Sequence, residues 1–218
     1  MLIAQPSQPP AAIASIDPAA MTPYCGGISE DPAKLRRGLV TGSTYLKFLS
    51  SLPPACGDHC VSPYRIGVRP ADMVALAQTN GRYVCAEHWP PHGPSPLIGG
   101  WLSRSRVHII PNGRRTHPIP WWDGLWESPD AWISIKTSDG LIHASGQANW
   151  RGYRFGEFKA TVRPVGDEVD VHGGGFDDCS IRLLAFGERI VAADNGKCGA
   201  TNVTFRGFYV RKKRVRTG

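Results

Sequence analysis

Cysteine is the residue type with the most distinct chemistry in this chain of 218 residues. An even number of cysteines is typical of disulfides formed in an oxidising compartment. Two cysteines near the C-terminus bracket two late strand-like segments, and we expect these two to pair. The other four allow several pairings, and we expect two further disulfides among them. The residues are Cys25, Cys56, Cys60 and Cys85, with Cys179–Cys198 as the expected pair.

Zinc binding is the alternative use of the first cysteines. Cys56 and Cys60 are separated by three residues, and Cys85 precedes His88 by three positions, so together they could form a Cys3His site. The first spacing is at the loose end of the usual range, and exported chains favour disulfides. We therefore expect no metal and no cofactor.

A group of acidic residues flanks a glycine-rich stretch, residues 173–175, and could bind calcium or supply a carboxylate pair. The fixed ligand spacing of a helix–loop–helix calcium site is absent, so we interpret the group as a solvated strand end. The chain also lacks a Gly-x-Ser-x-Gly or His-Glu-x-x-His motif. We therefore expect no catalytic residue and no enzyme. The acidic residues are Asp167, Glu168, Asp170, Asp177 and Asp178.

Tryptophan is the best candidate for binding a partner. An exposed indole offers a large flat apolar surface with one hydrogen-bond donor, and Trp121 and Trp122 are adjacent. The alternative is that Trp126 and Trp132 fill a core while Trp121 and Trp122 close its end. The residues expected to contact a partner are Trp89, His92, Trp121, Trp122, Ser145, Gln147, Asn149 and Tyr153.

The formal net charge of +7 is concentrated at the C-terminus. The cations there are Arg211, Lys212, Lys213, Arg214 and Arg216, and the rest of the chain is nearly neutral. A basic tail can contact phosphates or anionic lipids, but such a tail is more often a solvated end. We expect no nucleic-acid binding. No apolar run approaches the roughly 18 residues that a membrane helix needs.

Short strands joined by turns dominate the pattern. Glycine (25 residues) and proline (19 residues) are abundant, and no segment has a helical period, so we expect an all-β protein. Asn80-Gly81, Asp139-Gly140 and Asn195-Gly196 are expected turns. Strands are expected at residues 44–50, 73–77, 83–87 and 107–110. A second series, at residues 131–137, 141–150, 156–163, 168–172, 179–185, 189–194 and 202–210, predicts an antiparallel barrel or sandwich of about seven to eight strands.

The sequence divides into five segments. A disordered leader or spacer covers residues 1–24, a first β module with a cysteine-rich start covers 25–111, a linker covers 112–120, the antiparallel barrel covers 121–212, and a basic tail covers 213–218. The leader lacks the charged start and apolar core of a signal peptide. Because the cysteines favour export, we expect a periplasmic or secreted protein whose signal is absent from this sequence.

The first module resembles the bacterial SH3-type domain of exported, wall-associated proteins. The residues that carry the resemblance are Arg69-Pro70-Ala71-Asp72, Asn80-Gly81-Arg82-Tyr83-Val84 and Gly100-Trp101-Leu102. They span roughly residues 42–111. The resemblance implies a small barrel that holds a peptide or the cell wall.

The second half resembles the C-terminal β domain of exported bacterial proteins related to inhibitors of lysozyme. The matching elements are Trp126, Asp139-Gly140, Asp178-Cys179, Asp194-Asn195-Gly196, Cys198-Gly199 and residues 202–207. Ser145-Gly146 falls where such inhibitors carry a Ser-Gly loop that enters the lysozyme cleft. The resemblance implies binding to a protein.

Together these features predict a non-catalytic periplasmic binding protein. We expect an inhibitor or immunity protein that neutralises a wall-degrading hydrolase or another toxic enzyme. The alternative is a wall-associated module that binds peptidoglycan or another glycan through its aromatic residues. The sequence does not indicate an oligomeric state.

Overall fold

The fold is all-β, as the sequence predicts. The computed structural model describes residues 25, 27–28, 30–52, 60, 67–90, 98–111, 113–173 and 178–212, and in these ranges it contains strands and short 3-10 helices but no α-helix. The strands form one five-stranded sheet, one eight-stranded sheet and a two-stranded ribbon. The predicted leader and basic tail lie outside the described residues. No helix of the described part is long and apolar enough to cross a membrane.

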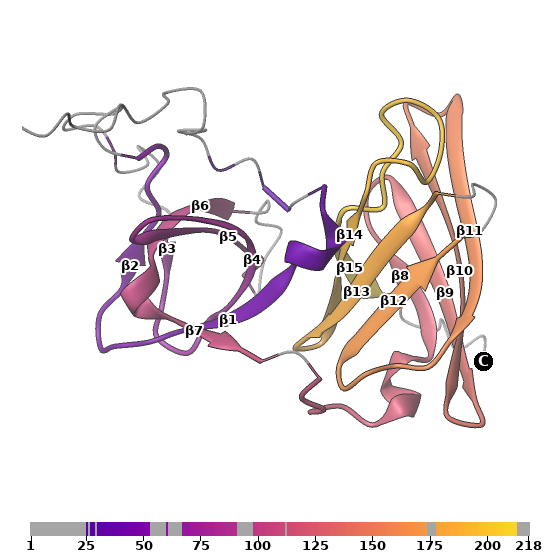
Figure 1. Cartoon of the computed structure of the whole chain (residues 1–218), viewed down its shortest axis with the longest axis horizontal. Helices are drawn as coiled ribbons and strands as arrows, with labels where there is room; N and C mark the ends of the chain where they lie inside the picture. Colours follow the sequence, from indigo (N-terminus) through magenta and orange to yellow (C-terminus); the bar gives the residue numbers. More distant parts are fainter. Residues whose placement is uncertain are drawn as a thin grey trace, which may run out of the picture.

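The five-stranded sheet, here called the first sheet, is antiparallel and strongly curled (Figure 1). Its strand order is β6-β5-β4-β1-β7, and its core is built from alternate apolar residues of these strands. The strands are β1 (Arg36–Val40), β4 (Met73–Asn80), β5 (Tyr83–His88), β6 (Ile98–Ser103) and β7 (Val107–Ile110). The ribbon pairs β2 (Leu46–Lys47) with β3 (Gly67–Val68), and the 3-10 helices are η2 (Pro32–Lys34) and η4 (Arg104–Arg106).

Strand β1 is missing from the sequence prediction, although it pairs with both β4 and β7. Its sequence contains two arginines and a glycine, which are unusual in a central strand. Gly38 is accommodated because the space beside it is too small for a side chain: a Cβ atom there would lie 2.6 Å from Cγ1 of Val107. Arg37 fits because a carboxylate distant in the sequence neutralises it.

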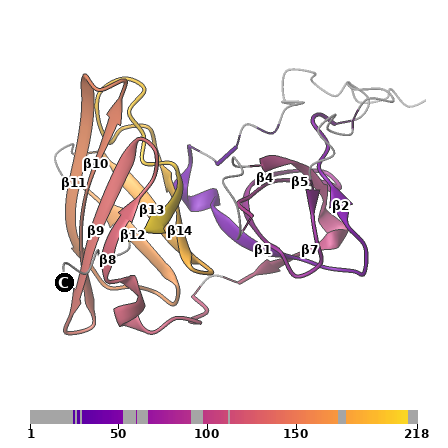
Figure 2. The same ribbon diagram turned by 180° about the vertical axis from the view of Figure 1, so that it is seen from behind.

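The eight-stranded sheet, here called the barrel, is antiparallel and nearly closed (Figures 1 and 2). Its strand order is β11-β10-β9-β8-β15-β14-β13-β12, and the two outermost strands also contact each other. The strands are β8 (Gly124–Glu127), β9 (Ala131–Ser138), β10 (Leu141–Trp150), β11 (Arg154–Val162), β12 (Glu168–His172), β13 (Ser180–Phe186), β14 (Arg189–Asp194) and β15 (Gly207–Arg211), preceded by the 3-10 helix η5 (Ile119–Trp122).

Turn chemistry sets the hairpins of the barrel. Asp139 and Gly140 both have positive φ, at 51° and 74°, and form the predicted two-residue turn between β9 and β10. Asn195-Gly196 does not by itself connect two paired strands. The β13–β14 hairpin turns at Gly187 and Glu188, because Phe186 pairs with Arg189, whereas Asn195 and Gly196 follow β14. The last strand is also shorter than predicted and begins at Gly207.

The first sheet packs against the outer face of β13, β14 and β15. The residues that precede β1 lie between the two sheets, where the indigo segment runs in Figures 1 and 2. An apolar cluster fills this contact. Its buried members are Ile28, Leu35, Ala75, Leu184, Phe186, Val191, Ala193 and Phe208, with Met73 and Trp89 partly buried beside them.

A buried ion pair joins the two sheets. Arg37 of β1 donates from Nη1 to Oδ2 of Asp167 at 3.0 Å and to the carbonyl of Ala185 at 3.1 Å, and both charged side chains are almost fully buried. Asp167 also accepts backbone N–H groups of Thr116 and His117 at 3.0–3.1 Å and the hydroxyl of Thr116. This one carboxylate therefore fixes the first sheet, the linking segment and the barrel together.

The hydrogen bonds to Asp167 lower the pKa of its carboxyl group. Burial alone would raise the pKa, but the donors on Thr116, Arg37 and His117 outweigh burial and lower the pKa from its ordinary value of 3.8 to about 2. A depressed carboxyl pKa contributes stability that is complete above the unfolded value. That contribution is lost as the pH falls through about 2.

We expect Asp167→Asn to destabilise the folded protein at pH 7 by about 3–5 kcal/mol, because it leaves the buried Arg37 without a counter-charge. Urea denaturation measures this loss, and the difference from wild type should shrink as the pH is lowered below about 4. The control is Asp178→Asn, which breaks the exposed Lys197–Asp178 pair and should cost about 1 kcal/mol or less. Equal losses for the two variants would contradict the role assigned to Asp167.

Candidate partner-binding surface

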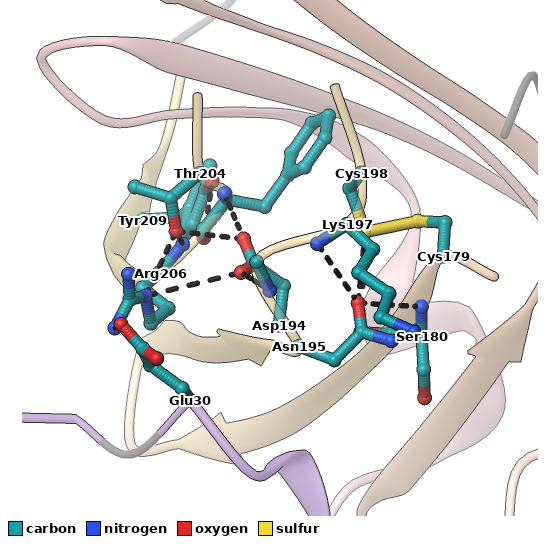
Figure 3. Close-up of polar contacts among 12 residues, drawn as sticks. Glu30, Cys179, Ser180, Asp194, Asn195, Lys197, Cys198, Thr204, Arg206 and Tyr209 are labelled. Carbon is teal, nitrogen blue, oxygen red and sulfur yellow. Dashed lines mark hydrogen bonds and ion pairs between the residues drawn. A yellow bond between two sulfur atoms is a disulfide. The ribbon is translucent and has the colours of Figure 1, made fainter. Parts of the chain in front are cut away.

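The predicted disulfide between Cys179 and Cys198 is present and ties the end of β13 to the loop after β14. Figure 3 shows Asn195 beside it. Asn195 accepts the backbone N–H of Ser180 at 3.2 Å and that of Lys197 at 3.2 Å, and its amide donates to the carbonyl of Asp178 at 2.6 Å. The disulfide and Asn195 thus hold the start of the 195–206 loop against the barrel.

Asp194 holds the end of the same loop (Figure 3). Its side chain is fully buried and accepts the N–H of Gly196 at 2.8 Å, the hydroxyl of Thr204 at 2.7 Å and the N–H of Phe205. Arg206 lies 3.8 Å away and forms an ion pair with Glu30 at 3.2 Å. Because both oxygens of Asp194 have partners, this carboxylate has a structural role in holding the loop.

The loop closes the barrel by packing on β11. A Cβ atom on Gly156 would lie 2.1 Å from the carbonyl oxygen of Cys198, and one on Gly199 would lie 2.6 Å from Cα of Gly156. The N–H of Ala200 donates to the carbonyl of Phe155 at 3.2 Å, and Arg154 donates to the carbonyl of Thr201 at 3.1 Å. Two glycines are needed here because the two backbones are in direct contact.

Beside this contact lies a surface of aromatic and guanidinium groups, here called the barrel-end surface. It has two parts: Trp132 and Phe155 lie on the outer face of the sheet, and Trp150, Arg151, Tyr153 and Arg154 lie at the end of the barrel, where Trp150 packs against the core. Tyr153 is 60% exposed, Phe155 50% and Trp132 38%. Such exposure of large aromatic side chains is typical of binding surfaces.

Two arginines stack on the aromatic rings of this surface. The guanidinium carbon of Arg151 lies 4.6 Å from the centre of the Trp150 ring, and that of Arg154 lies 5.2 Å from it. Tyr153 packs edge-on against Trp150 at 5.5 Å. Neither arginine has a carboxylate partner among the described residues, so both can pair with an acidic group of a ligand.

Four of the predicted contact residues lie near this surface. Ser145, Gln147 and Asn149 point outward from β10, in the alternation that places Ala144, Gly146 and Ala148 inside. Gln147 pairs with Trp132, and Asn149 pairs with Phe155. Tyr153 is in the adjoining β10–β11 turn.

Ser145 and Gly146 belong to the middle of a strand and do not form a projecting loop. Gly146 faces the core, where a Cβ atom would lie 2.5 Å from the Phe158 ring. The glycine is therefore explained by packing. The expectation of a Ser-Gly loop is corrected accordingly.

The division of the tryptophans between the barrel core and the surface differs from both interpretations of the sequence. Trp122 is 1% exposed and Trp126 is fully buried, so both belong to the barrel core. Trp121 is partly buried between His117, Trp126 and the guanidinium of Arg211. Trp132, expected in the core, is exposed because Ala131, Ile133 and Ile135 occupy the inner face of β9, and the alternation along the strand places Trp132 on the outer face. The indole of Trp122 is not accessible to a partner.

Trp89 lies in the contact between the sheets, edge-on against Phe208 and under the guanidinium of Arg189. His92 lies outside the described residues. The structure thus brings together the β10 residues and Tyr153, and it leaves Trp89, Trp121 and Trp122 elsewhere.

The cysteines exclude the alternative zinc site. Cys85 forms a disulfide with Cys25, and Cys60 is also disulfide-bonded, so neither can serve as a thiolate ligand. Cys56 lies outside the described residues. Nδ1 of His88 donates to the carbonyl of Met73 at 2.8 Å. In the described part of the chain, no group of three or more His, Cys, Asp or Glu side chains could hold a metal ion.

The cleft between the sheets, of about 350 Å³, is lined by Asp72, His88, Trp89 and Arg189 among others. Two of its charged groups are already engaged, while Glu188, which also lines the cleft, is exposed. Asp72 accepts the N–H of Arg69 at 2.7 Å, and Arg189 donates to the carbonyls of Trp89 and Pro90 at 2.9 and 3.1 Å. The cleft therefore offers fewer free groups to a partner than the barrel-end surface does.

The residues that sequence reasoning missed are Phe155, Arg151 and Arg154, together with the exposed side of Trp132. The alternation Gly156, Phe158, Ala160 and Val162 on the inner face of β11 is the signal that places Phe155 outside.

Comparisons with protein families, curated proteins and solved structures found no match for this chain. The two family resemblances therefore stay predictions.

We expect Gly156→Ala to detach the loop from β11, because its Cβ atom would overlap the Cys198 carbonyl. Hydrogen exchange of the Ala200 amide should rise at least tenfold relative to wild type. The control is Gly152→Ala, which strains the β10–β11 turn because Gly152 has a φ of 77°, but whose Cβ atom meets nothing within 4 Å; it should leave the Ala200 amide protected. Unchanged protection in Gly156→Ala would show that the loop does not depend on this contact.

Proposed function

We propose that this protein is an exported, non-catalytic binding protein that neutralises a wall-degrading hydrolase or another toxic enzyme in the periplasm. The observation that carries the proposal is the barrel-end surface, which combines the exposed Tyr153, Phe155 and Trp132 with two arginines that have no carboxylate partner among the described residues. Tyrosine, tryptophan and arginine are the residues that most often dominate the binding energy of protein interfaces.

Rigidity of the surface supports binding to a protein. The surface lies on a barrel strand that is held by the 195–206 loop, by the Cys179–Cys198 disulfide and by the buried Asp194. A preformed surface loses little conformational entropy on association. The disulfides support export, because they persist in oxidising compartments.

The charge of the surface indicates the chemistry of the partner. The guanidinium groups of Arg151 and Arg154 stack on the Trp150 ring; Arg154 also donates to the carbonyl of Thr201, and neither has a carboxylate partner among the described residues. Such groups pair well with carboxylates. A catalytic cleft of a glycan hydrolase carries paired carboxylates, so a cationic aromatic surface is suited to cover it.

Binding of peptidoglycan or another glycan is the second candidate function. Trp132 and Phe155 are exposed on the same outer face, with the polar Gln147 and Asn149 between them. Flat apolar rings beside amide groups are suited to a sugar chain. Sedimentation with purified sacculi in high salt distinguishes the two, because stacking on sugars persists when ionic contacts are screened.

We expect the double variant Tyr153→Ala/Phe155→Ala to weaken binding of the captured partner at least tenfold, as loss of central aromatic contacts does in protein interfaces. The wild-type protein is used to capture partners from a bacterial periplasmic extract, and an inhibition assay is run on each captured hydrolase or toxin. The matched control is Val165→Ala, an exposed apolar residue on the β11–β12 connection, which should bind as wild type.

Three outcomes decide between the candidates. Capture of a hydrolase or toxin that the protein inhibits, with loss in the double variant only, supports neutralisation. Sedimentation with sacculi that fails in Trp132→Ala supports glycan binding. If no inhibited hydrolase or toxin is captured and the protein does not sediment with sacculi, both candidate functions are wrong.

A further inference from the structure

The segment before β1, here called the strap, consists of the described residues of 25–35. One end is tied to β5 by the Cys25–Cys85 disulfide. Its apolar residues Ile28 and Leu35 are buried between the two sheets. Glu30 pairs with Arg206 of the barrel at 3.2 Å. The strap therefore takes part in the contact between the sheets.

Glu87 lies on β5 directly beneath the strap. Its side chain is buried, with 8% of the residue exposed, and its carboxylate accepts the backbone N–H of Ile28. Gly27 packs so closely that a Cβ atom there would lie 2.5 Å from Oε1 of Glu87. Oε2 has no hydrogen-bond partner among the described residues. A buried carboxylate with an unpartnered oxygen is costly when it is ionised.

The surroundings of Glu87 do not compensate this charge. Its cross-strand neighbours are Ala75 on β4 and Gly99 on β6, which have no polar side chain. Arg37 on β1 lies across from Ala75 on the same face. Its Nη1 is engaged by Asp167, and its Nη2 has no hydrogen-bond partner among the described residues, the Glu87 carboxyl group included.

The other charged or titratable groups on the elements around Glu87 are also engaged elsewhere. They are Glu30 with Arg206, His88 with Asp72 at 3.7 Å and with Met73, and Arg189 with Trp89. Within the described residues, none of them has an ion pair or hydrogen bond with the Glu87 carboxyl group.

We propose that Glu87 is a proton-controlled latch, which holds the strap against β5 and the barrel when its carboxyl group is protonated and loosens the strap when the group is ionised. The carboxylic acid form removes the uncompensated charge from the apolar contact. The ionised form favours an opened strap, because water can then reach Oε2. This inference does not rest on the proposed function.

The expected pH range follows from the burial of Glu87. Burial raises its pKa from the ordinary value of 4.5 to about 7, and the N–H of Ile28 opposes this only in part. A raised carboxyl pKa favours the closed strap at low pH. The equilibrium constant for closing the strap then falls about tenfold per pH unit between about pH 4.5 and pH 7. Above about pH 7 it no longer changes with pH.

Hydrogen exchange of the strap amides, residues 27–28, 30–31 and 33–35, tests the latch on the whole protein with its disulfides intact. The protection factor, corrected for the intrinsic pH dependence of exchange, should fall by about tenfold or more between pH 5 and pH 8 in the wild type. In Glu87→Gln, which stays neutral, it should be independent of pH. The control Glu157→Gln, an exposed residue of β11, should behave as wild type.

A protection factor that does not change with pH in the wild type, or that falls equally in Glu87→Gln, would overturn the proposal. Direct titration of the Glu87 carboxyl carbon by NMR provides a second test that needs no variant. The proposal expects a midpoint well above 4.5, and a midpoint near 4.5 would overturn it even if Glu87→Gln failed to fold.

Discussion

The buried pair between Arg37 and Asp167 is the interaction on which the arrangement of this molecule depends. A charged side chain at the centre of a small sheet would be unfavourable alone, yet Arg37 lies on β1, a strand that joins β4 to β7. Asp167 neutralises it from the barrel and also accepts the N–H groups of Thr116 and His117. One carboxylate therefore couples the folding of the first sheet to the placement of the barrel. The Arg37–Asp167 pair defines how the two sheets are placed, and the apolar contact around Leu35 and Phe208 adds buried surface between them.

At the opposite end of the barrel, closure depends on backbone contact. Gly156 and Gly199 let the 195–206 loop lie directly on β11, and the Cys179–Cys198 disulfide and Asp194 hold the two ends of that loop. An open sheet edge invites uncontrolled pairing with other chains, and this loop covers part of that edge. The same device presents the barrel-end surface on rigid backbone. The cysteine motif thus has a structural role, and the proposed binding role belongs to neighbouring residues.

Local signals in the sequence predict much of the fold. The Asp139-Gly140 turn and the alternation in β10 lie within a few residues of each other, so they are readable without tertiary information, and the predicted bounds of β10 are correct. Strand β1 was not predictable, because Arg37 and Gly38 are explained only by Asp167 and Val107, which are far away in the sequence. For the candidate site, Tyr153 and the outward β10 residues were predicted. Trp122 was misplaced, because composition does not tell which of several adjacent tryptophans the core accepts.

The barrel-end surface is the proposed site at which this protein binds its partner. Hydrogen–deuterium exchange of the full chain, free and in complex with a partner captured from the periplasm, tests it most directly. The account predicts slowed exchange at residues 150–156 and 131–133 on binding, with little change at the cleft between the sheets. Slowed exchange confined to residues 71–73, 88–89 and 186–189, with none at the barrel end, would contradict it.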